Sequence, residues 1–362
     1  MKKAIVPLIF VATIAVAVAF WVNRAPKTQV ATGPSAPTSA SSGSAANGSK
    51  TGSSAANPIN VSVGNVNESG VAEVEVVEEI PAVKPAGETY ASAQEALDAV
   101  LKGSKDYDDS ILEQFTQPGP ECTWCLEFYT SVRDKATNAS TPQEQRAYLA
   151  EILAISGKIE NIQTLTESIK TARSNDEADM YAEALELSLG NDEVVRYLGE
   201  QMVSPNDTLR EASVAAVTNQ GTVEALEILS KHTKERGDPD GYYSSGIGIA
   251  EFIPEANALP TVQDNIRMRD EYSHLYVKSA LNAGMPGVEA LFAELENSTN
   301  PEADRAILLK EGPIEHVNLE DGLKEYVDGV IQRNRSPVAV EFAKKIRDEF
   351  NQQETETDDT AS

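Results

Sequence analysis

The chain has 362 residues, with 57 Asp and Glu against 30 Lys and Arg, and a formal net charge of −27 at pH 7. Because nucleic-acid binding requires clustered Lys and Arg that contact phosphates, this charge argues against a nucleic-acid partner. It also disfavours close approach to an anionic lipid surface. An acidic excess often serves only solubility; its functional interpretation is a basic partner or loosely held divalent cations.

The first predicted element is a hydrophobic helix at the N-terminus. Ala4–Val22 is an uncharged apolar run of 19 residues, preceded by Lys2 and Lys3. At ~1.5 Å rise per residue this run spans about 28 Å, close to the ~30 Å hydrocarbon core of a bilayer. Residues 1–24 are therefore predicted to form a transmembrane anchor.

A cleaved signal peptide is the alternative to this anchor. Ala15-Val16-Ala17 and Ala17-Val18-Ala19 both satisfy the small-x-small rule for signal cleavage. Apolarity continues through Trp21, however, and an interfacial aromatic at that place favours the anchor. Both interpretations put most of the protein outside the cytoplasm. We expect a single-pass membrane protein with a cytoplasmic N-terminus and its bulk in the periplasm or at the cell surface.

Residues 25–87 are predicted to be a disordered, low-complexity linker. Residues 25–58 are almost wholly Ala, Ser, Gly, Thr, Pro and Asn, which cannot bury enough apolar surface to offset their ordering entropy. A flexible tether over 25–80 would reach roughly 40 Å. The β-branched residues of 71–80 could form a short strand that pairs with a partner's sheet edge, or could be extended linker.

Residues 88–139 are predicted to be an N-terminal helical cap containing the only two cysteines, Cys122 and Cys125. An extracytoplasmic compartment favours a disulfide between them. A redox-active pair is an alternative, although the βαβ context of a thioredoxin-like motif is missing. Free thiols or a metal site are a further alternative, but zinc would need two more ligands. No catalytic residue, metal site or cofactor is predicted.

Glycine- or proline-marked turns recur every 31–33 residues between residues 140 and 351. The turns lie at Gly157, Gly190, Gly221, Pro254 and Gly287. Five residues after each turn comes an apolar residue: Ile162, Val195, Leu226, Leu259 and Phe292. Eight residues after each comes another: Leu165, Leu198, Leu229, Val262 and Leu295. A looser sixth unit starts at Gly322, with Val327 and Val330 at the same offsets. Positions i and i+3 share one helix face, and repetition at this period predicts a stacked array of short units.

Helix starts are marked by an oxygen-bearing residue followed by proline. Proline costs little at the first helical position, and the preceding side chain can cap free N–H groups. These pairs are Thr141-Pro142, Ser204-Pro205, Asn300-Pro301 and Ser336-Pro337. Small residues recur eight positions before four of the turns, where two helices of a pair could approach closely: Ala182, Ser213, Gly246 and Ser279. No stretch of 88–351 alternates as a half-buried strand should, so the predicted fold is all-α.

The two helical stretches around Gly221, over residues 209–229, resemble the short HEAT-like repeats of α-solenoid proteins. The resemblance covers roughly residues 140–350. It implies a curved α-solenoid of about six helix pairs that binds other macromolecules, and it implies no chemistry. The tetratricopeptide repeat has a similar period, but its Trp…Leu-Gly…Tyr signature is absent from these units. An irregular helical bundle is the remaining alternative.

The segment 238–243 contains two further candidate sites. Tyr242 and Tyr243 follow an acidic turn and could form a partner-contact patch, since aromatic residues are enriched at interfaces. The alternative is that neighbouring Gly246 and Gly248 simply permit tight helix packing. The turn at 238–241 lacks the later acidic ligands of a calcium loop. The last segment, 352–362, is predicted to be an acidic disordered tail.

Two functions follow as hypotheses. The first is a membrane-tethered extracytoplasmic scaffold or adaptor that binds another protein of a bacterial-type envelope. The alternative is a membrane-tethered thiol–disulfide oxidoreductase that uses Cys122 and Cys125.

Overall fold

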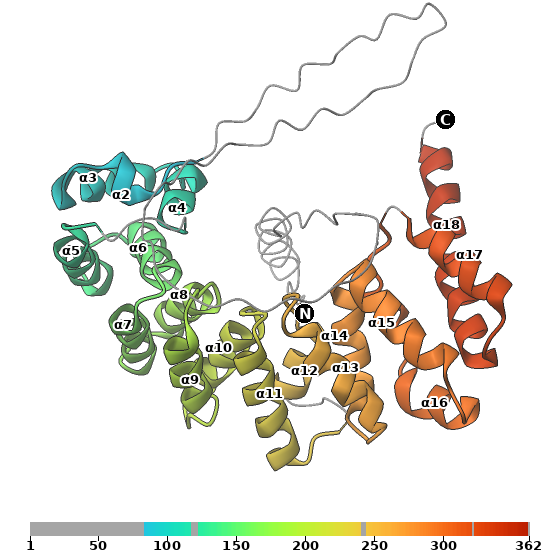
Figure 1. Cartoon of the computed structure of the whole chain (residues 1–362). Coiled ribbons are helices and arrows are strands. Elements are labelled where there is room, and N and C mark those ends of the chain that lie inside the picture. Colours follow the sequence, from blue (N-terminus) through green and yellow to red (C-terminus); the bar gives the residue numbers. More distant parts are fainter. Residues whose placement is uncertain (1–82, 117–121, 240–243, 321, 361–362) are drawn as a thin grey trace, which may run out of the picture. The chain divides into compact units, whose positions relative to one another are not determined.

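The computed structural model describes residues 83–116, 122–239, 244–320 and 322–360, with the backbone alone for 353–360 (Figure 1). The predicted anchor, the linker up to residue 82, the strand at 71–80, and Tyr242 and Tyr243 lie outside these residues. The described part is all-α, as predicted, and contains no strand. No helix in this part is long and apolar enough to cross a membrane.

Four helices form the N-terminal end of the described chain: α2 (Ala86–Thr89), α3 (Ala93–Gly103), α4 (Asp109–Thr116) and α5 (Cys125–Thr137). Ser92 caps α3 by accepting a hydrogen bond from the Glu95 N–H, while the Glu95 carboxylate accepts one from the Ala91 N–H. The Ser92 side chain thus satisfies a free N–H in the first turn of α3, and Glu95 ties the residue before the cap to the same turn.

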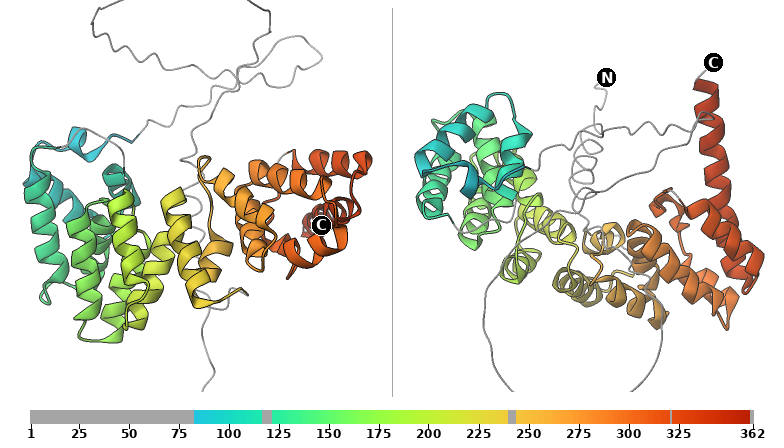
Figure 2. Two further views of the ribbon diagram at one scale, coloured as in Figure 1. Left: turned by 60° about the horizontal axis from the view of Figure 1, so that its bottom comes forward. Right: turned by 45° about the horizontal axis from the view of Figure 1, so that its top comes forward.

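The following helices alternate between two layers. The inner layer contains α6 (Gln143–Ile155), α8 (Asn175–Glu186), α10 (Asp207–Thr218), α12 (Ser244–Glu251) and α14 (Ser273–Asn282). The outer layer contains α7 (Ile159–Lys170), α9 (Asp192–Gln201), α11 (Val223–Arg236), α13 (Leu259–Met268) and α15 (Met285–Glu296). Each inner helix packs on the next inner helix, and Figures 1 and 2 show this layer along the inner side of a curved row.

The C-terminal end contains α16 (Pro301–Leu308), the 3-10 helix η1 (Pro313–His316), α17 (Leu323–Arg333) and α18 (Pro337–Thr360). η1 packs on α14, and α16 and α15 both pack on α18. α18 continues beyond residue 351, the boundary predicted for the repeats.

The repeated apolar positions form the core, as the spacing predicted. All five residues at the eighth position after a turn are fully buried, and so are four of the five at the fifth position. Leu259 is the exception and is half-buried, because it is the first residue of α13. Val327 and Val330 of the sixth unit are buried in α17. The helices therefore pack in neighbouring pairs around one continuous core, which is consistent with a helical-repeat fold.

The structure corrects the phase of the predicted pairs. Each of the outer helices α7, α9, α11 and α13 packs most closely on the inner helix that follows it, and α5 packs on α6 in the same way. The glycine- and proline-marked turns therefore join one pair to the next instead of lying inside a pair. Gly157 and Gly221 have φ values of 64° and 69°, a left-handed conformation that favours glycine in such turns.

Hydrogen bonds between successive turns hold the pairs in register. The Leu189 N–H donates to the Ala154 carbonyl at 3.3 Å. The Asn219 Nδ2 donates to the Glu186 carbonyl at 2.9 Å, and the Asn282 Nδ2 donates to the Ala250 carbonyl at 2.8 Å. Each bond satisfies a carbonyl in the last turn of an inner helix, where no intrahelical partner remains.

The Ser/Thr/Asn-Pro signals located some helix starts but not all. Asn300 caps α16 through a bond from the Ala303 N–H, and α18 begins at Pro337. α6 begins one residue after Pro142, without a side-chain cap. α10 begins at Asp207, because the Asn206 side chain caps it and Ser204 instead accepts from the Asn206 N–H.

Candidate functional site

The inner layer carries carboxylates of one sign on its exposed surface. Neighbouring helices cover each of α6, α8, α10 and α12 on both sides and the outer layer covers them from behind, so their exposed side chains face inward. Asp207 and Glu211 of α10 lie within reach of Arg210, and Glu144 lies in the first turn of α6. The other six exposed or half-buried carboxylates of these helices define the acidic inner face: Glu151, Asp176, Asp179, Glu183, Glu186 and Glu251. Among the described residues, none of these six is ion-paired with Lys or Arg.

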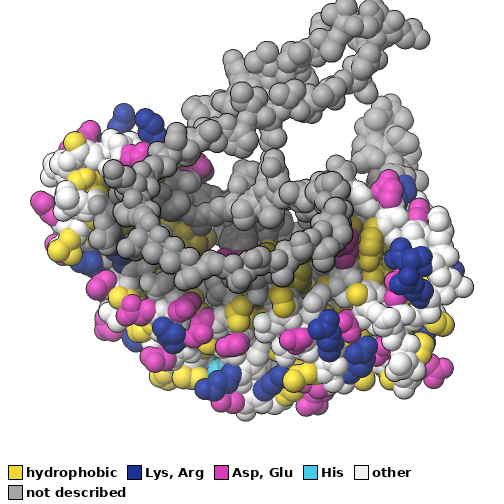
Figure 3. Space-filling view, in the orientation of Figure 1, with side chains coloured by type: hydrophobic (Ala, Val, Ile, Leu, Met, Phe, Trp, Pro, Cys, Tyr) yellow, Lys and Arg dark blue, Asp and Glu magenta, His cyan; other side chains and the backbone are white. Residues whose placement is uncertain are grey.

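The few cations of the inner layer are already matched with acids. α8 and α12 contain no Lys or Arg at all. Arg146 of α6 is buried against Glu177, and Arg210 of α10 pairs with Asp207 at 2.7 Å. Lys278 of α14 is buried and pairs with Glu311 at 3.6 Å. By contrast, Figure 3 shows Lys and Arg interspersed with Asp and Glu along the lower, outer side of the molecule.

Three of the six carboxylates lie close together on α6 and α8. Burial, and next the charge of Glu183, raise the pKa of Glu151 to about 7. The same two causes raise the pKa of Glu186 to about 7. The Tyr107 hydroxyl donates a hydrogen bond to Glu151, and its ring packs edge-on against Tyr148. Since these carboxylates have lost water without gaining a cation, an approaching positive charge would stabilise their ionised form.

Glu177 on the same helix shows the opposite situation. Its carboxylate accepts hydrogen bonds from the Arg173 N–H and Nε, both at 2.9 Å, and from the Arg146 guanidinium. Hydrogen bonding to Arg173, which outweighs burial, lowers the pKa of Glu177 to about 2. The buried acid of α8 thus has its cations within the chain, whereas the exposed acids of α8 do not.

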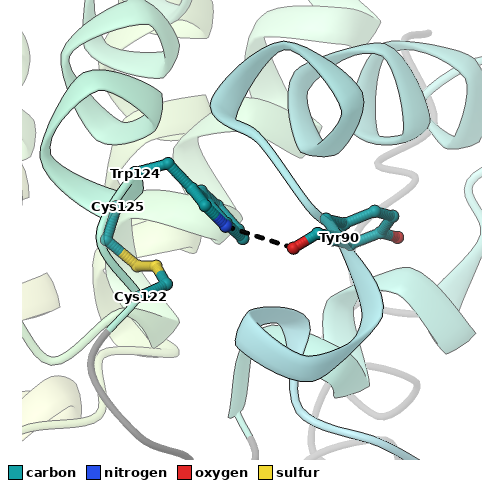
Figure 4. Close-up of a disulfide and its surroundings, with 4 residues drawn as sticks. All are labelled: Tyr90, Cys122, Trp124 and Cys125. Atoms are coloured by element: carbon teal, nitrogen blue, oxygen red, sulfur yellow. Dashed lines mark hydrogen bonds between the residues drawn. A yellow bond between two sulfur atoms is a disulfide. The ribbon is translucent and has the colours of Figure 1, made fainter.

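The cysteine pair lies at the start of α5, the helix that packs on α6. Cys122 and Cys125 are joined as a disulfide with a Cα–Cα distance of 5.2 Å (Figure 4). The indole Nε1 of Trp124, between them, donates to the Tyr90 carbonyl at 3.1 Å. Phe128 packs edge-on against Trp124. The pair therefore fixes a turn whose aromatic residue joins α5 to the segment before α3.

The position of α5 bears on the redox alternative. A helix N-terminus lowers the pKa of a thiol in its first turn and activates it. Only Cys125 lies in α5; Cys122 precedes the helix in a turn, with its carbonyl accepting from the Cys125 N–H at 3.2 Å. The redox-active pair stays a prediction.

Other predicted sites gain no support from the described residues. Within them, no group of three or more His, Cys, Asp or Glu side chains is arranged to hold a metal ion. Tyr242 and Tyr243 cannot be placed, because they lie outside the described residues.

Sequence reasoning missed the acidic inner face, although a signal was present. Asp176, Asp179, Glu183 and Glu186 follow one another at helical spacing, so they occupy one face of α8. The missing information was that this face belongs to the inner layer.

Comparison with known proteins adds no assignment: no family model matches the chain, and no curated protein or solved structure was found to be similar.

Proposed function

We propose that this protein is a membrane-tethered, extracytoplasmic helical-repeat scaffold whose acidic inner face binds a basic segment of another envelope protein. Residues 1–24 would provide the tether and residues 25–82 the spacer. The repeats would be HEAT-like, with the layer α6–α8–α10–α12 as the binding surface. The role is binding without chemistry.

The observation that carries the proposal is that, within the residues described, no Lys or Arg forms an ion pair with a carboxylate of the acidic inner face, and α8 and α12 contain neither residue. Ionising Glu151 and Glu186 is unfavourable, since burial and a neighbouring carboxylate raise the pKa of each to about 7. A Lys or Arg side chain of a partner would remove that cost. Charge complementarity of this kind also speeds encounter and excludes acidic partners.

Binding of a lysine-rich peptide tests the proposal. The probe is a fluorescein-labelled peptide of alternating lysine and glycine, titrated with the full chain in detergent and followed by fluorescence anisotropy. The test variant neutralises the α8 stripe with Asp176→Asn, Asp179→Asn, Glu183→Gln and Glu186→Gln. At about 0.3–0.5 kcal/mol for each pair, the four changes should weaken binding about eight- to thirty-fold.

A matched control separates position from total charge. Glu160→Gln, Glu167→Gln, Glu193→Gln and Glu227→Gln remove the same number of charges from exposed positions of the outer helices α7, α9 and α11. This variant should bind the peptide nearly as well as the unchanged protein. If both variants lose affinity equally, the peptide senses only net charge and the inner face is not a binding site.

The tether is tested separately. Intact mass and N-terminal sequencing of the mature protein should show Lys2 and Lys3 still present. A mature chain that begins at Val18 or Phe20 would mean signal cleavage and would remove the tether from the proposal.

A further inference from the structure

A hollow of about 210 Å³ opens between α12, α14 and the segment that leads into η1. Gly246 and Ala250 of α12 contribute almost no side-chain volume, which leaves space above α14. Ile247 lies beside them, 43% exposed. Polar groups from three elements line the same space: Glu251 of α12, Lys278 of α14, and Glu311 before η1.

Lys278 is the distinctive group in this hollow. Its side chain is only 11% exposed, and its ammonium lies 3.6 Å from the nearest Glu311 oxygen. That distance exceeds the 2.7–3.2 Å of a hydrogen bond, so the ion pair leaves the ammonium donors poorly used. Burying an ammonium is costly unless good acceptors surround it. The hollow therefore contains a largely buried cation whose ion-pair partner among the described residues lies beyond hydrogen-bond distance.

Glu311 demonstrates what kind of acceptor fits there. It is a carboxylate, and its side chain is 45% exposed on a segment outside the regular helices. Its backbone has φ 61°, the left-handed conformation that non-glycine residues rarely adopt. Neither burial nor a short hydrogen bond to Lys278 holds its side chain over the hollow. A second carboxylate could displace it and approach Lys278 more closely.

The other titratable groups of the hollow are Glu251, His316 and Glu315. Burial raises the pKa of Glu251, whose carboxylate is the group of the hollow that opposes an anion. His316 lies 3.3 Å from Asn282 through its Nδ1, and burial and Lys278 lower its pKa, so the imidazole is neutral at pH 7. Glu315 is 3.9 Å from His316 but 72% exposed, where solvent screens its charge.

We propose that this hollow is a binding site for a carboxylate group, with Lys278 as its charge partner and Glu311 as the internal carboxylate that the ligand replaces. A small organic acid and the C-terminus of a polypeptide share this chemistry. The site does not rest on the basic-segment proposal, because its charge partner is the cation Lys278, although Glu251 of the acidic inner face lines the same hollow. With one charge-assisted contact at its centre, a dissociation constant on the order of 1 mM is expected.

NMR of the histidine side chains tests this site in the full chain. The protein has three histidines, so ¹³C-histidine labelling gives few signals, and His316→Gln identifies the one at the hollow. Acetate serves as the small carboxylate, and acetyl-tetra-alanine with a free carboxyl end serves as the chain terminus. The same peptide with an amidated end lacks the carboxylate. Carboxylate ligands should shift the His316 signal saturably, and the amidated peptide should not.

Comparing the ligands shows whether the site binds small organic acids or the C-terminus of a polypeptide. A saturable shift by both acetate and the free peptide supports a site for any carboxylate. A shift by the free peptide alone supports a site for chain ends. An equal shift by the amidated peptide, or no saturable shift at millimolar concentrations of any ligand, would overturn the proposal.

Two substitutions at the hollow complete the test. Lys278→Met should abolish the shift, while Lys231→Met on the outer helix α11, 76% exposed, should leave it unchanged. Glu311→Gln removes the competing carboxylate and should tighten binding about five-fold. If Lys278→Met does not fold, Glu311→Gln still tests the proposal. Unchanged or weaker binding by Glu311→Gln contradicts the displacement, and a retained shift in folded Lys278→Met contradicts the site.

Discussion

Replacing Gly287 with alanine would force α15 away from α14. An alanine Cβ at this position would lie 1.6 Å from the Ala280 carbonyl oxygen and 2.6 Å from its carbon. Both atoms belong to the backbone of α14, a helix that is buried from Ser273 to Leu281. Because backbone cannot rotate out of the way like the end of a side chain, the two helices themselves must separate.

The distances set the size of the effect. Ordinary van der Waals contact begins at about 3.4 Å, so the start of α15 would have to move by about 1.8 Å. That movement loosens Val288, Leu291 and Phe292, which are buried on this helix. Overpacking typically costs about 1–3 kcal/mol and sometimes more, while replacing a helical glycine with alanine returns up to about 1 kcal/mol. We expect a net loss of about 2 kcal/mol in the free energy of unfolding.

Urea unfolding of the full chain, followed by circular dichroism, measures this loss. Gly329→Ala in α17 is the matched control, because its nearest neighbour is the flexible end of Arg333 at 3.1 Å. That substitution should leave stability unchanged or raise it by up to about 1 kcal/mol. Hydrogen exchange should accelerate around residues 280–296 in Gly287→Ala. If the two variants have equal stability, the backbones of α14 and α15 do not approach each other as closely as described.

Three further outcomes are expected. Leu198→Ala and Leu229→Ala should each cost about 2–5 kcal/mol, because both side chains are fully buried. Faster hydrogen exchange should stay within the affected pair and its neighbours, whereas an even spread over the chain would indicate one globular bundle. Replacing Cys122 and Cys125 with serine should lower stability only modestly, since a short loop gains little from closure, and should spare peptide binding; mixed disulfides trapped in cells by Cys125→Ser alone would instead support the oxidoreductase. Glu186→Gln should act in a pH-dependent way. The folded pKa of Glu186 is about 7 against a normal 4.5, so the folded state binds more protons between these values and loses stability as pH rises. The glutamine variant should therefore be more stable above pH 7 by on the order of 1 kcal/mol and indistinguishable below pH 4.5 in thermal unfolding; a difference that persists at low pH would contradict the assigned cause.

The apolar spacing predicted burial well because periodicity reports directly on one face of a helix. Residues five and eight positions after a turn fall on that face whatever lies against it, and Leu198 and Leu229 are fully buried as a result. The same spacing does not say which neighbour covers the face. Turns of similar length precede and follow each helix, so the spacing alone does not fix which two helices form a pair.

The predicted start of a helix was wrong where two capping residues lie within a few positions of each other. Ser204 and Asn206 both offer a side-chain oxygen near the start of α10, and proline follows Ser204. The structure uses Asn206, whose Oδ1 accepts from the Leu209 N–H at 3.0 Å, while Ser204 orders the turn before it. Local preference alone ranks such neighbours nearly equally, and packing of the following helix decides between them.

The meaning of the negative charge depends on its location, which composition does not contain. Glu177 and Glu183 are indistinguishable in the sequence of α8, yet one is buried between two arginines and the other faces the inner side without a cation among the described residues. A solubility device needs charge on any exposed surface and gains nothing from leaving partly buried carboxylates unpaired. A surface for a basic ligand needs its unpaired charge on one connected face. The equal-charge variants of α8 and of the outer helices separate these two explanations, because only the second makes position matter.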